Sequence, residues 1–296
     1  MARTTVVIAT RDRPVELART LCRLRTDLPG TPVVVVDNAS ADPLEPWIAG
    51  QYPDVEAIRL ESNRGAAGRT VGVRRARTEF VAFCDDDSTW DPGAAAVAER
   101  TFDAYPTLGL LAARTLVGED QRPDAITPAL ATSPLPSMRP LPGPRVLGFL
   151  ACSAIVRRHA YLGAGGFDPL LHFAGEERLL ALDLAARGWD LCYLPELIAR
   201  HHPSDIRPPS AWRRRREMRN DALTEWMRRP VGVALGSTAR LVGRGLTDAS
   251  ARGAASDVLR LLPSALSRRR PLPAPVERDV RLLEKHPPGT PAEVSP

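Results

Sequence analysis

The chain has 296 residues, 44% of them hydrophobic and 25% charged, so it can bury a substantial core and is neither disordered nor fibrous. Its formal net charge is +5. The arginine excess lies late in the chain, in runs such as 213–216 and 268–270. Such runs indicate either solvated helix faces or an anionic partner.

The four cysteines include no C-x-x-C pair, and three of them lie in or beside apolar runs. This pattern indicates buried thiols in a reducing compartment. No stretch reaches the roughly 18 uninterrupted apolar residues that a spanning helix needs. The chain runs from Met1 directly into a strand-like segment, without the regions of a secretion signal. We therefore expect a cytoplasmic protein, with any membrane contact peripheral at the inner face of the membrane.

The first third of the chain alternates β-branched runs with segments of helical apolar spacing. The elements predicted there are a strand at 4–10, a helix at 15–24, strands at 33–36 and around 58–60, a helix from 68 to about 77 and a strand at 80–84. Nearly continuous apolar strands are typical of a sheet covered on both faces. The order strand, helix, strand predicts an α/β fold with a parallel sheet.

The remainder predicts a less regular half and then helices. The expected elements are a helix at 93–104, a strand at 109–113, a long Pro- and Ser-rich loop at 119–144, a strand at 149–156, a turn at 163–167, a helix at 176–187, a strand at 191–194, a basic helix at 211–229 and helical segments at 235–266. We therefore predict one α/β domain over 1–229, a helical extension at 230–266 and a Pro-rich, partly disordered tail at 267–296.

An acidic triplet, Asp85, Asp86 and Asp87, follows the strand at 80–84. Open parallel sheets bind ligands beyond the carboxyl ends of their strands, where Asp37 is also predicted to lie. Adjacent carboxylates repel one another, and a divalent cation would offset that repulsion. On an extended segment Asp85 and Asp87 would share one side and could bind one Mg²⁺ or Mn²⁺. An exposed acidic turn or a helix cap is the structural alternative.

Four segments, in this order, resemble glycosyltransferase family 2, whose enzymes have the GT-A fold. They are VVIATRDR at 6–13, VVVVDNAS at 33–40, NRGAAGRTVGVRRARTEFVAF at 63–83 leading into the D-x-D triplet, and 165–202 with its GFD, GEE and GW motifs. The resemblance implies a Rossmann-like, mostly parallel sheet flanked by helices, with a C-terminal helical extension. Within the catalytic domain at 1–229, it implies a nucleotide-sugar half at 1–113 and an acceptor half at 145–202.

The resemblance also implies an activity: inverting transfer of a sugar from a UDP-, GDP- or dTDP-sugar to a hydroxyl of a saccharide, lipid-linked or small-molecule acceptor. Glu177 is implied as the general base, since a carboxylate can accept the hydroxyl proton. A divalent ion would stabilise the diphosphate leaving group. The implied donor-binding residues are Thr10, Arg13, Asp37, Arg69, Asp85 and Asp86; the metal ligands are Asp85, Asp87 and His201; Glu176 and Trp189 lie on the acceptor side.

Each of these assignments has a structural alternative. Glu176 and Glu177 could favour the positive end of the following helix, His201 could be a surface histidine, and Trp189 could pack in the core. The chain also departs from the family pattern at Thr70, Leu179 and Ser88. Because these positions lie in donor and acceptor contacts of the family, the departures affect the expected identity of the sugar and the acceptor more than the expected type of reaction.

Three other functions compete with this interpretation. A haloacid-dehalogenase-type phosphatase would carry its D-x-D on the first strand, and a sugar nucleotidyltransferase would have a Gly-rich, arginine-containing loop after Ile8. The third is a non-enzymatic module that binds an anionic lipid or nucleic-acid surface through the helix at 211–229. Such a module would have no use for the triplet or Glu177. We expect no nucleic-acid partner, whereas contact with an anionic membrane surface stays open.

Overall fold

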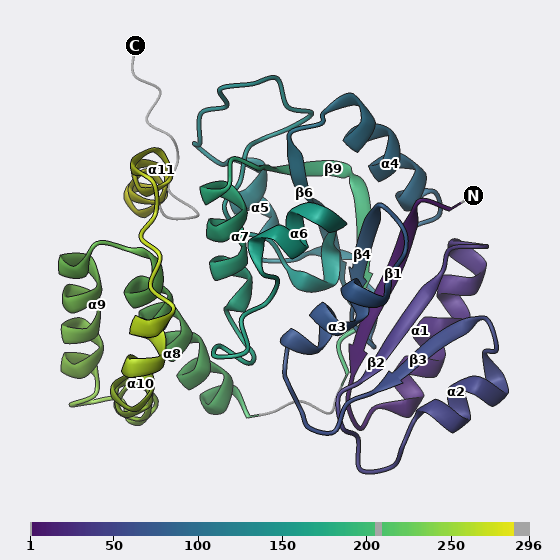
Figure 1. Ribbon diagram of the computed structural model, residues 1–296, viewed down its shortest axis with the longest axis horizontal. Helices are drawn as coiled ribbons and strands as arrows, with labels where there is room; N and C mark the ends of the chain where they lie inside the picture. The colour runs from purple at the N-terminus through teal and green to yellow at the C-terminus, as the bar shows by residue number, and fades with distance from the viewer. Residues whose placement is uncertain (1, 205–208, 287–296) are drawn as a thin grey trace.

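The computed structural model describes residues 2–204 and 209–286. One sheet with helices on both faces occupies most of the molecule, and further helices extend from one side (Figure 1). Its first elements are β1 (Thr4–Thr10), α1 (Pro14–Asp27), β2 (Val33–Asp37), α2 (Glu45–Gln51), β3 (Val55–Arg59), α3 (Ala67–Arg75), β4 (Phe80–Cys84), β5 (Ser88–Trp90) and α4 (Ala94–Ala104). Then follow β6 (Leu108–Val117), β7 (Arg122–Pro123), α5 (Thr127–Ala131), a 3₁₀ turn (Ala151–Ser153), β8 (Ala154–Arg157), α6 (Arg158–Ala164), α7 (Glu176–Ala186) and β9 (Asp190–His201). The last helices are α8 (Ser210–Arg228), α9 (Val231–Arg244), α10 (Ala249–Ser267) and α11 (Ala274–Lys285).

The sheet has the strand order β3-β2-β1-β4-β8-β6-β9-β5. Strands β3, β2, β1 and β4 are parallel, β8 is antiparallel to both of its neighbours, and β9 runs parallel to β6. Thr10 pairs with Asp37, and Ile8 pairs with Cys84, so the carboxyl ends of β1, β2 and β4 meet at one edge. The predicted α/β fold is therefore confirmed, and its register brings the candidate site residues to that edge.

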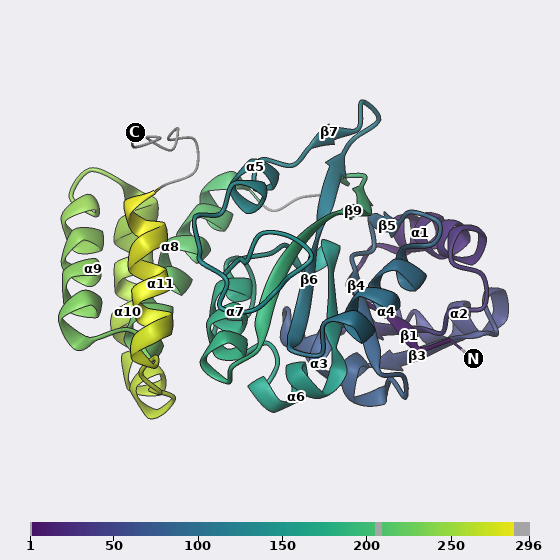
Figure 2. The ribbon, with the colours of Figure 1, turned by 90° about the horizontal axis from the view of Figure 1, so that it is seen from above.

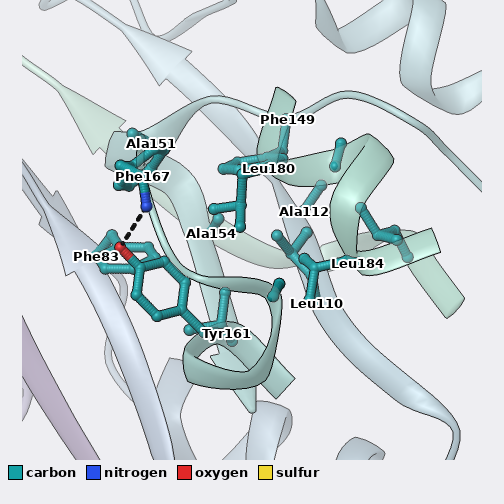
Figure 3. Close-up of a cluster of buried hydrophobic side chains, with 14 of the residues drawn as sticks. Phe83, Leu110, Ala112, Phe149, Ala151, Ala154, Tyr161, Phe167, Leu180 and Leu184 are labelled. Carbon is teal, nitrogen blue, oxygen red and sulfur yellow. Dashed lines mark hydrogen bonds between the residues drawn. The ribbon is translucent and has the colours of Figure 1, made fainter. Parts of the chain in front are cut away.

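The alternation of side chains along the strands separates two apolar layers. Val7 and Phe83 belong to the layer beneath α3, α6 and α7, whereas Ile8 belongs to the layer beneath α1 and α4. Figure 3 shows the first layer around Phe83, Tyr161 and Phe167, where the Phe167 backbone N–H donates to Tyr161 Oη over 3.2 Å. This aromatic cluster includes Phe167 of the turn that follows α6.

The C-terminal helices lie on the opposite side of the molecule from β1, β2 and β3 (Figures 1 and 2). Helix α8 packs on both α9 and α10, and their apolar cluster also includes Leu171 and Leu179 from the α/β part. A helical extension is present, as predicted. The domain boundaries at 229 and 266 stay a prediction, because α8 shares one apolar cluster with the helices that follow it.

Several elements differ from the sequence-based expectation. The strand predicted at 191–194 continues to His201, since β9 pairs with β6 and then with β5. The strand predicted at 149–156 is shorter, because a 3₁₀ turn precedes β8. The short elements α2, β5 and α5 were not expected, and α5 lies within the predicted long loop.

The largest difference is in the tail expected at 267–296, which contains helix α11. Val276 and Val280 on one face of α11 are buried in the main core. Arg229, which is only 1% exposed, pairs with Glu277 and Glu284 of this helix. Burial and charge pairing thus order a segment whose composition indicates a flexible tail. Residues 287–296 lie outside the described part of the chain.

The basic helix is not simply a solvated face either. Arg219, Arg228 and Arg229 of the 211–229 segment are buried. The Arg228 guanidinium pairs with Asp183 on α7, which ties α8 to the α/β part.

Cys84, Cys152 and Cys192 are buried free thiols, as expected, and Cys22 is exposed. Across residues 2–204 and 209–286, no helix has the length and hydrophobicity needed to cross a bilayer.

Candidate functional site

The acidic triplet lies in a tight turn between β4 and β5. The Asp85 backbone N–H donates to Ser88 Oγ over 2.7 Å, and the Ser88 N–H donates to the Asp85 carbonyl over 3.2 Å. Because the chain turns here, the three side chains do not alternate as in a strand. The expectation that Asp85 and Asp87 face one side and Asp86 another is therefore wrong. Arg13 Nη1 instead approaches both Asp86 and Asp87, at 3.2 and 3.5 Å.

Asp86 is buried between β1 and α1. Thr10 Oγ1 donates to Asp86 Oδ2 over 2.7 Å, Arg13 Nη1 donates to Oδ1 over 3.2 Å, and Thr20 Oγ1 donates to the Asp86 carbonyl over 2.8 Å. Burial raises the pKa of Asp86 to about 6, although the Thr10 bond and the Arg13 charge oppose that shift. Three predicted donor-binding residues, Thr10, Arg13 and Asp86, thus form one connected group.

Asp87 faces the end of β9. His201 Nε2 lies 3.3 Å from Asp87 Oδ1, and the Ser204 backbone N–H donates to Oδ2 over 3.1 Å. Burial acts to raise the pKa of Asp87, but the bonds from His201 and Ser204 and the nearby Arg13 charge outweigh it and lower the pKa. Two predicted metal ligands, Asp87 and His201, therefore lie side by side although they are far apart in the sequence.

Asp85 points away from the other two and toward α3. Its side chain, 31% exposed, accepts a hydrogen bond from Arg69 Nη2. Arg69 is buried, and its guanidinium carbon lies 6.0 Å from the centre of the Phe167 ring. The Asp85, Glu176 and Glu177 carboxylates all act to raise the pKa of Arg69, against its burial. Arg69 therefore lies between the triplet and the first turn of α7.

Glu176 and Glu177 begin α7, where the Gly175 backbone has φ +82°. Glu177 Oε1 accepts a hydrogen bond from the Ala151 backbone N–H over 3.4 Å. Glu176 is 3% exposed, and its Oε2 has no hydrogen-bond partner among the described residues. Burial raises the pKa of both carboxyl groups, and Arg69 partly offsets this. Glu176 and Glu177 therefore lose their protons at a higher pH than ordinary exposed glutamates do.

Asp37 has a different role from the predicted contact with the nucleotide base. Its side chain is fully buried. Its oxygens accept hydrogen bonds from the backbone N–H of Ser40 over 2.8 Å, the N–H of Leu44 over 3.2 Å and Arg59 Nη1 over 2.9 Å. A base could reach Asp37 only if these bonds opened. In this structure Asp37 stabilises the turn that follows β2.

Trp189 also lies away from the acceptor side. Glu176 and Glu177 begin α7, whereas Trp189 follows its far end; a helix of 11 residues spans about 16 Å. The Trp189 ring packs against His159, with ring centres 5.2 Å apart, and against Gly109, where an added Cβ would lie 2.9 Å from the Trp189 side chain. Trp189 is half-buried and packs against the main core at the far end of α7 from Glu176 and Glu177, and its acceptor-side role stays a prediction.

The donor atoms near the triplet fit a divalent ion that takes part of its coordination from a ligand. Within the part of the chain that the structure describes, no three His, Cys, Asp or Glu side chains surround a single point closely enough to enclose an ion. Mg²⁺ is commonly held by one or two carboxylates together with substrate phosphates. The Asp87 and His201 pair, with Asp85 on the same turn, provides oxygen and nitrogen donors of that kind.

Comparison with known proteins decides the family. A family model described as Glycosyl transferase family 2 matches residues 5–162, which is more than half of the chain. This chain belongs to glycosyl transferase family 2. The match covers β1 to α6 and so includes Thr10, Arg13, Arg69 and the triplet, but it ends before Glu177.

Among curated relatives, this family 2 chain is similar to a pre-mycofactocin glycosyltransferase of Mycobacterium tuberculosis. The two are 35% identical over 210 residues, which cover 69% of this chain and 43% of the relative. The chain therefore spans less than half the length of the curated relative that it matches.

Solved structures confirm the GT-A fold of this family 2 chain. S. aureus TarS 1–349 in complex with UDP-GlcNAc matches with a TM-score of 0.57 at 19% identity, over 75% of this chain and 66% of that one. The mannosyltransferase PcManGT from Pyrobaculum calidifontis, in complex with GDP-Man and Mn²⁺, matches with a TM-score of 0.53 at 17% identity, over 96% of this chain and 76% of that one. At these low sequence identities, the similarity to the solved structures shows a shared fold alone.

Two residues near the site of this family 2 chain were not anticipated. Ser204 supplies a backbone N–H to Asp87, and Asn38 ties the end of β2 to the segment that precedes α3, through bonds to Gly65 and Arg64. Gly65 has φ +56°, and a Cβ there would lie 2.0 Å from the His172 carbonyl. The glycine of the N-x-G motif was the available signal, since such a close backbone approach requires glycine.

Proposed function

We propose that this chain is an inverting glycosyltransferase that moves a sugar from a nucleoside-diphosphate sugar to an acceptor hydroxyl. The observation that carries the proposal is the position of Arg69, between the Asp85 carboxylate and the Glu176 and Glu177 pair. One buried cation thus joins the predicted donor side to the predicted acceptor side. A transfer reaction requires the donor and acceptor to meet at such a point.

On the donor side, Asp87 and His201 would hold a divalent ion, Mg²⁺ or Mn²⁺, which would neutralise charge on the diphosphate leaving group. Asp85 would join them as a third ligand only if its bond to Arg69 opened. Thr10 and Arg13 fix Asp86 at the floor of the same turn. Support comes from a structural neighbour, the mannosyltransferase that was solved with GDP-Man and Mn²⁺. The donor is proposed as a UDP-, GDP- or dTDP-sugar.

On the acceptor side, Glu177 accepts the proton of the attacking hydroxyl, and the displacement inverts the anomeric carbon. The Ala151 N–H bond orients the Glu177 carboxylate from the 3₁₀ turn before β8. The raised pKa of Glu177, caused by burial, makes its carboxylate a stronger base than an exposed glutamate. The acceptor is proposed to be a saccharide, a lipid-linked molecule or a small molecule; the M. tuberculosis relative is named for pre-mycofactocin.

Paired substitutions at the two sides test this proposal. Glu177→Gln should retain donor binding and lose transfer by about 10²- to 10⁴-fold, which is the usual contribution of a general base. Asp87→Asn should weaken metal-dependent donor binding. Titration with UDP-, GDP- and dTDP-sugars by thermal shift, with Mn²⁺ or with a chelator, identifies the donor, and a transfer assay with that donor measures the rate.

The two variants control for each other. If Glu177→Gln transfers sugar at the normal rate, Glu177 is not the general base. If Asp87→Asn binds the donor with unchanged metal dependence, Asp87 is not a metal ligand. If no nucleotide sugar stabilises the wild-type chain under any metal condition, the proposal that this chain uses such donors is wrong.

A further inference from the structure

The exposed apolar surface of this protein is concentrated on its C-terminal helices. Eight large hydrophobic side chains in the described residues are exposed, and six of them lie on α9, α10 and the turn between these helices. They are Val231 (49% exposed), Leu235 (54%), Val242 (48%), Leu246 (81%), Leu259 (60%) and Leu266 (45%). Single exposed apolar residues are ordinary, but a group of this kind on adjacent helices marks an interaction surface.

The spacing places these side chains in stripes. Val231, Leu235 and Val242 are four and seven residues apart, and Leu259 and Leu266 are separated by seven, so each set lies along one side of its helix. Leu246 lies in the turn just after α9. Helices α9 and α10 pack against each other and lie at the end of the molecule farthest from β1, β2 and β3 (Figures 1 and 2). We call the six side chains the α9–α10 apolar face.

The same segment carries an excess of positive charge. Residues 230–270 contain seven arginines and two aspartates, which is a net charge of +5, equal to that of the whole chain. Both aspartates are engaged within the protein: Asp248 caps the N-terminus of α10, and Asp257 pairs with Arg215. Arg252 on α10 is exposed and lies seven residues before Leu259, on the same side of that helix, whereas the exposed Arg240 and Arg244 lie on the other side of α9 from Val231 and Val242.

The arginine run of α8 is less suited to an anionic partner. Arg213 pairs with Glu217, Arg214 with Asp248 and Arg215 with Asp257. Arg219, Arg228 and Arg229 are buried. Most arginines of the helix at 211–229 are therefore paired or buried.

We propose that the α9–α10 apolar face, with Arg252 beside it and the net positive charge of residues 230–270, docks this protein on the surface of an anionic lipid bilayer. Helices that lie in the membrane interface combine an apolar side, which enters the headgroup boundary, with arginine or lysine, which binds anionic lipid headgroups. A second copy of this chain fits the face less well, because symmetric pairing would bring two segments of charge +5 together. A nucleic acid would leave the leucines without a partner.

Docking at this face has a consequence for the candidate site. The face and the carboxyl ends of β1, β2 and β4 lie in different parts of the molecule, so a protein seated on a bilayer through α9 and α10 keeps its crevice open. The inference does not rest on the proposed transfer activity. It rests on the exposure, spacing and charge of residues outside the candidate site.

Vesicle co-sedimentation of the full chain tests the inference. The probes are vesicles of pure phosphatidylcholine and vesicles that contain 30% phosphatidylglycerol. We expect the wild type to bind the anionic vesicles and not the neutral ones, with affinity that falls as salt rises. Leu235→Glu combined with Leu259→Glu should weaken binding at least about tenfold. Arg252→Ala should weaken it about fivefold, the effect expected of one arginine near the surface.

The control is Met138→Glu, which changes an apolar residue that is 94% exposed outside α9 and α10 and should leave vesicle binding unchanged. Circular dichroism verifies that each variant is folded, and light scattering reports the oligomeric state. The inference is overturned if the wild type binds neither vesicle or binds both equally, or if the leucine double variant and Arg252→Ala both bind as the wild type does. It is also overturned if the leucine variant converts a dimer to a monomer while vesicle binding persists.

Discussion

Arg69 donates a hydrogen bond to Asp85, 16 residues farther along the chain, and the same guanidinium interacts electrostatically with Glu176 and Glu177. A buried arginine with three carboxylates around it is a compact charge network. Two of these carboxylates have a raised pKa from burial. The charge of Arg69 therefore helps to keep Glu177 ionised, and it connects the two halves of the candidate site.

Replacing Arg69 should change how activity depends on pH. In Arg69→Met the pKa of Glu177 should rise further, because a positive charge that opposes the effect of burial is lost. The acid limb of the kcat profile should then move to higher pH, since kcat reports groups in the enzyme–substrate complex. Arg69→Lys retains the charge and should restore most of the profile. If the acid limb of the kcat profile does not move in Arg69→Met, the charge of Arg69 does not affect the pKa of Glu177.

Asp86 should make the folded state less stable as pH rises. Its folded pKa of about 6 lies above its ordinary value of 3.8, so the folded state binds the proton more tightly than the unfolded state does. This stabilisation is present at low pH and is lost between about pH 4 and pH 6, at a cost on the order of 3 kcal/mol. Urea unfolding of Asp86→Asn across this range, with a chelator present, should show a shallower pH dependence than the wild type. If the free energy of unfolding depends on pH equally in Asp86→Asn and in the wild type, the pKa of Asp86 is not raised in the folded state.

The Arg228–Asp183 pair should be costly to break from one side. Both side chains are largely buried, so Arg228→Met alone leaves the Asp183 carboxylate uncompensated. We expect the free energy of unfolding to fall by about 3–5 kcal/mol. Adding Asp183→Leu removes the buried charge and should recover much of that loss. A double variant no more stable than Arg228→Met would show that the pair is not coupled in this way.

Helix α11 should depend on Arg229 for its attachment. Arg229→Ala removes the cation that Glu277 and Glu284 share. Hydrogen exchange of residues 274–285 should become faster, because opening of this helix then costs less. Glu284→Gln is the matched control: Glu284 is 50% exposed, and exposed pairs contribute little. Equal protection of α11 in the wild type and Arg229→Ala would leave the apolar contacts of Val276 and Val280 as its attachment.

Much of the α/β part could be predicted from local patterns. The strands β1, β2 and β4 are nearly continuous apolar runs, and the acidic triplet follows one of them, so their shared edge follows from parallel order. The tail could not be predicted in this way. Its composition is rich in proline, and contacts with Arg145, Arg229 and the core, all distant in sequence, attach α11 to the rest of the protein.

By itself, the sequence determined the family, the parallel half of the sheet and the position of the triplet at a strand end, because these depend on local periodicity and short motifs. The tertiary structure alone decided which carboxylate meets which partner. The turn after β4 sends Asp85 to Arg69 and leaves Asp86 and Asp87 to Arg13. It also decided that Asp37 binds the turn after β2 and that Trp189 packs against His159, because side-chain direction at a turn depends on neighbours that local sequence does not specify.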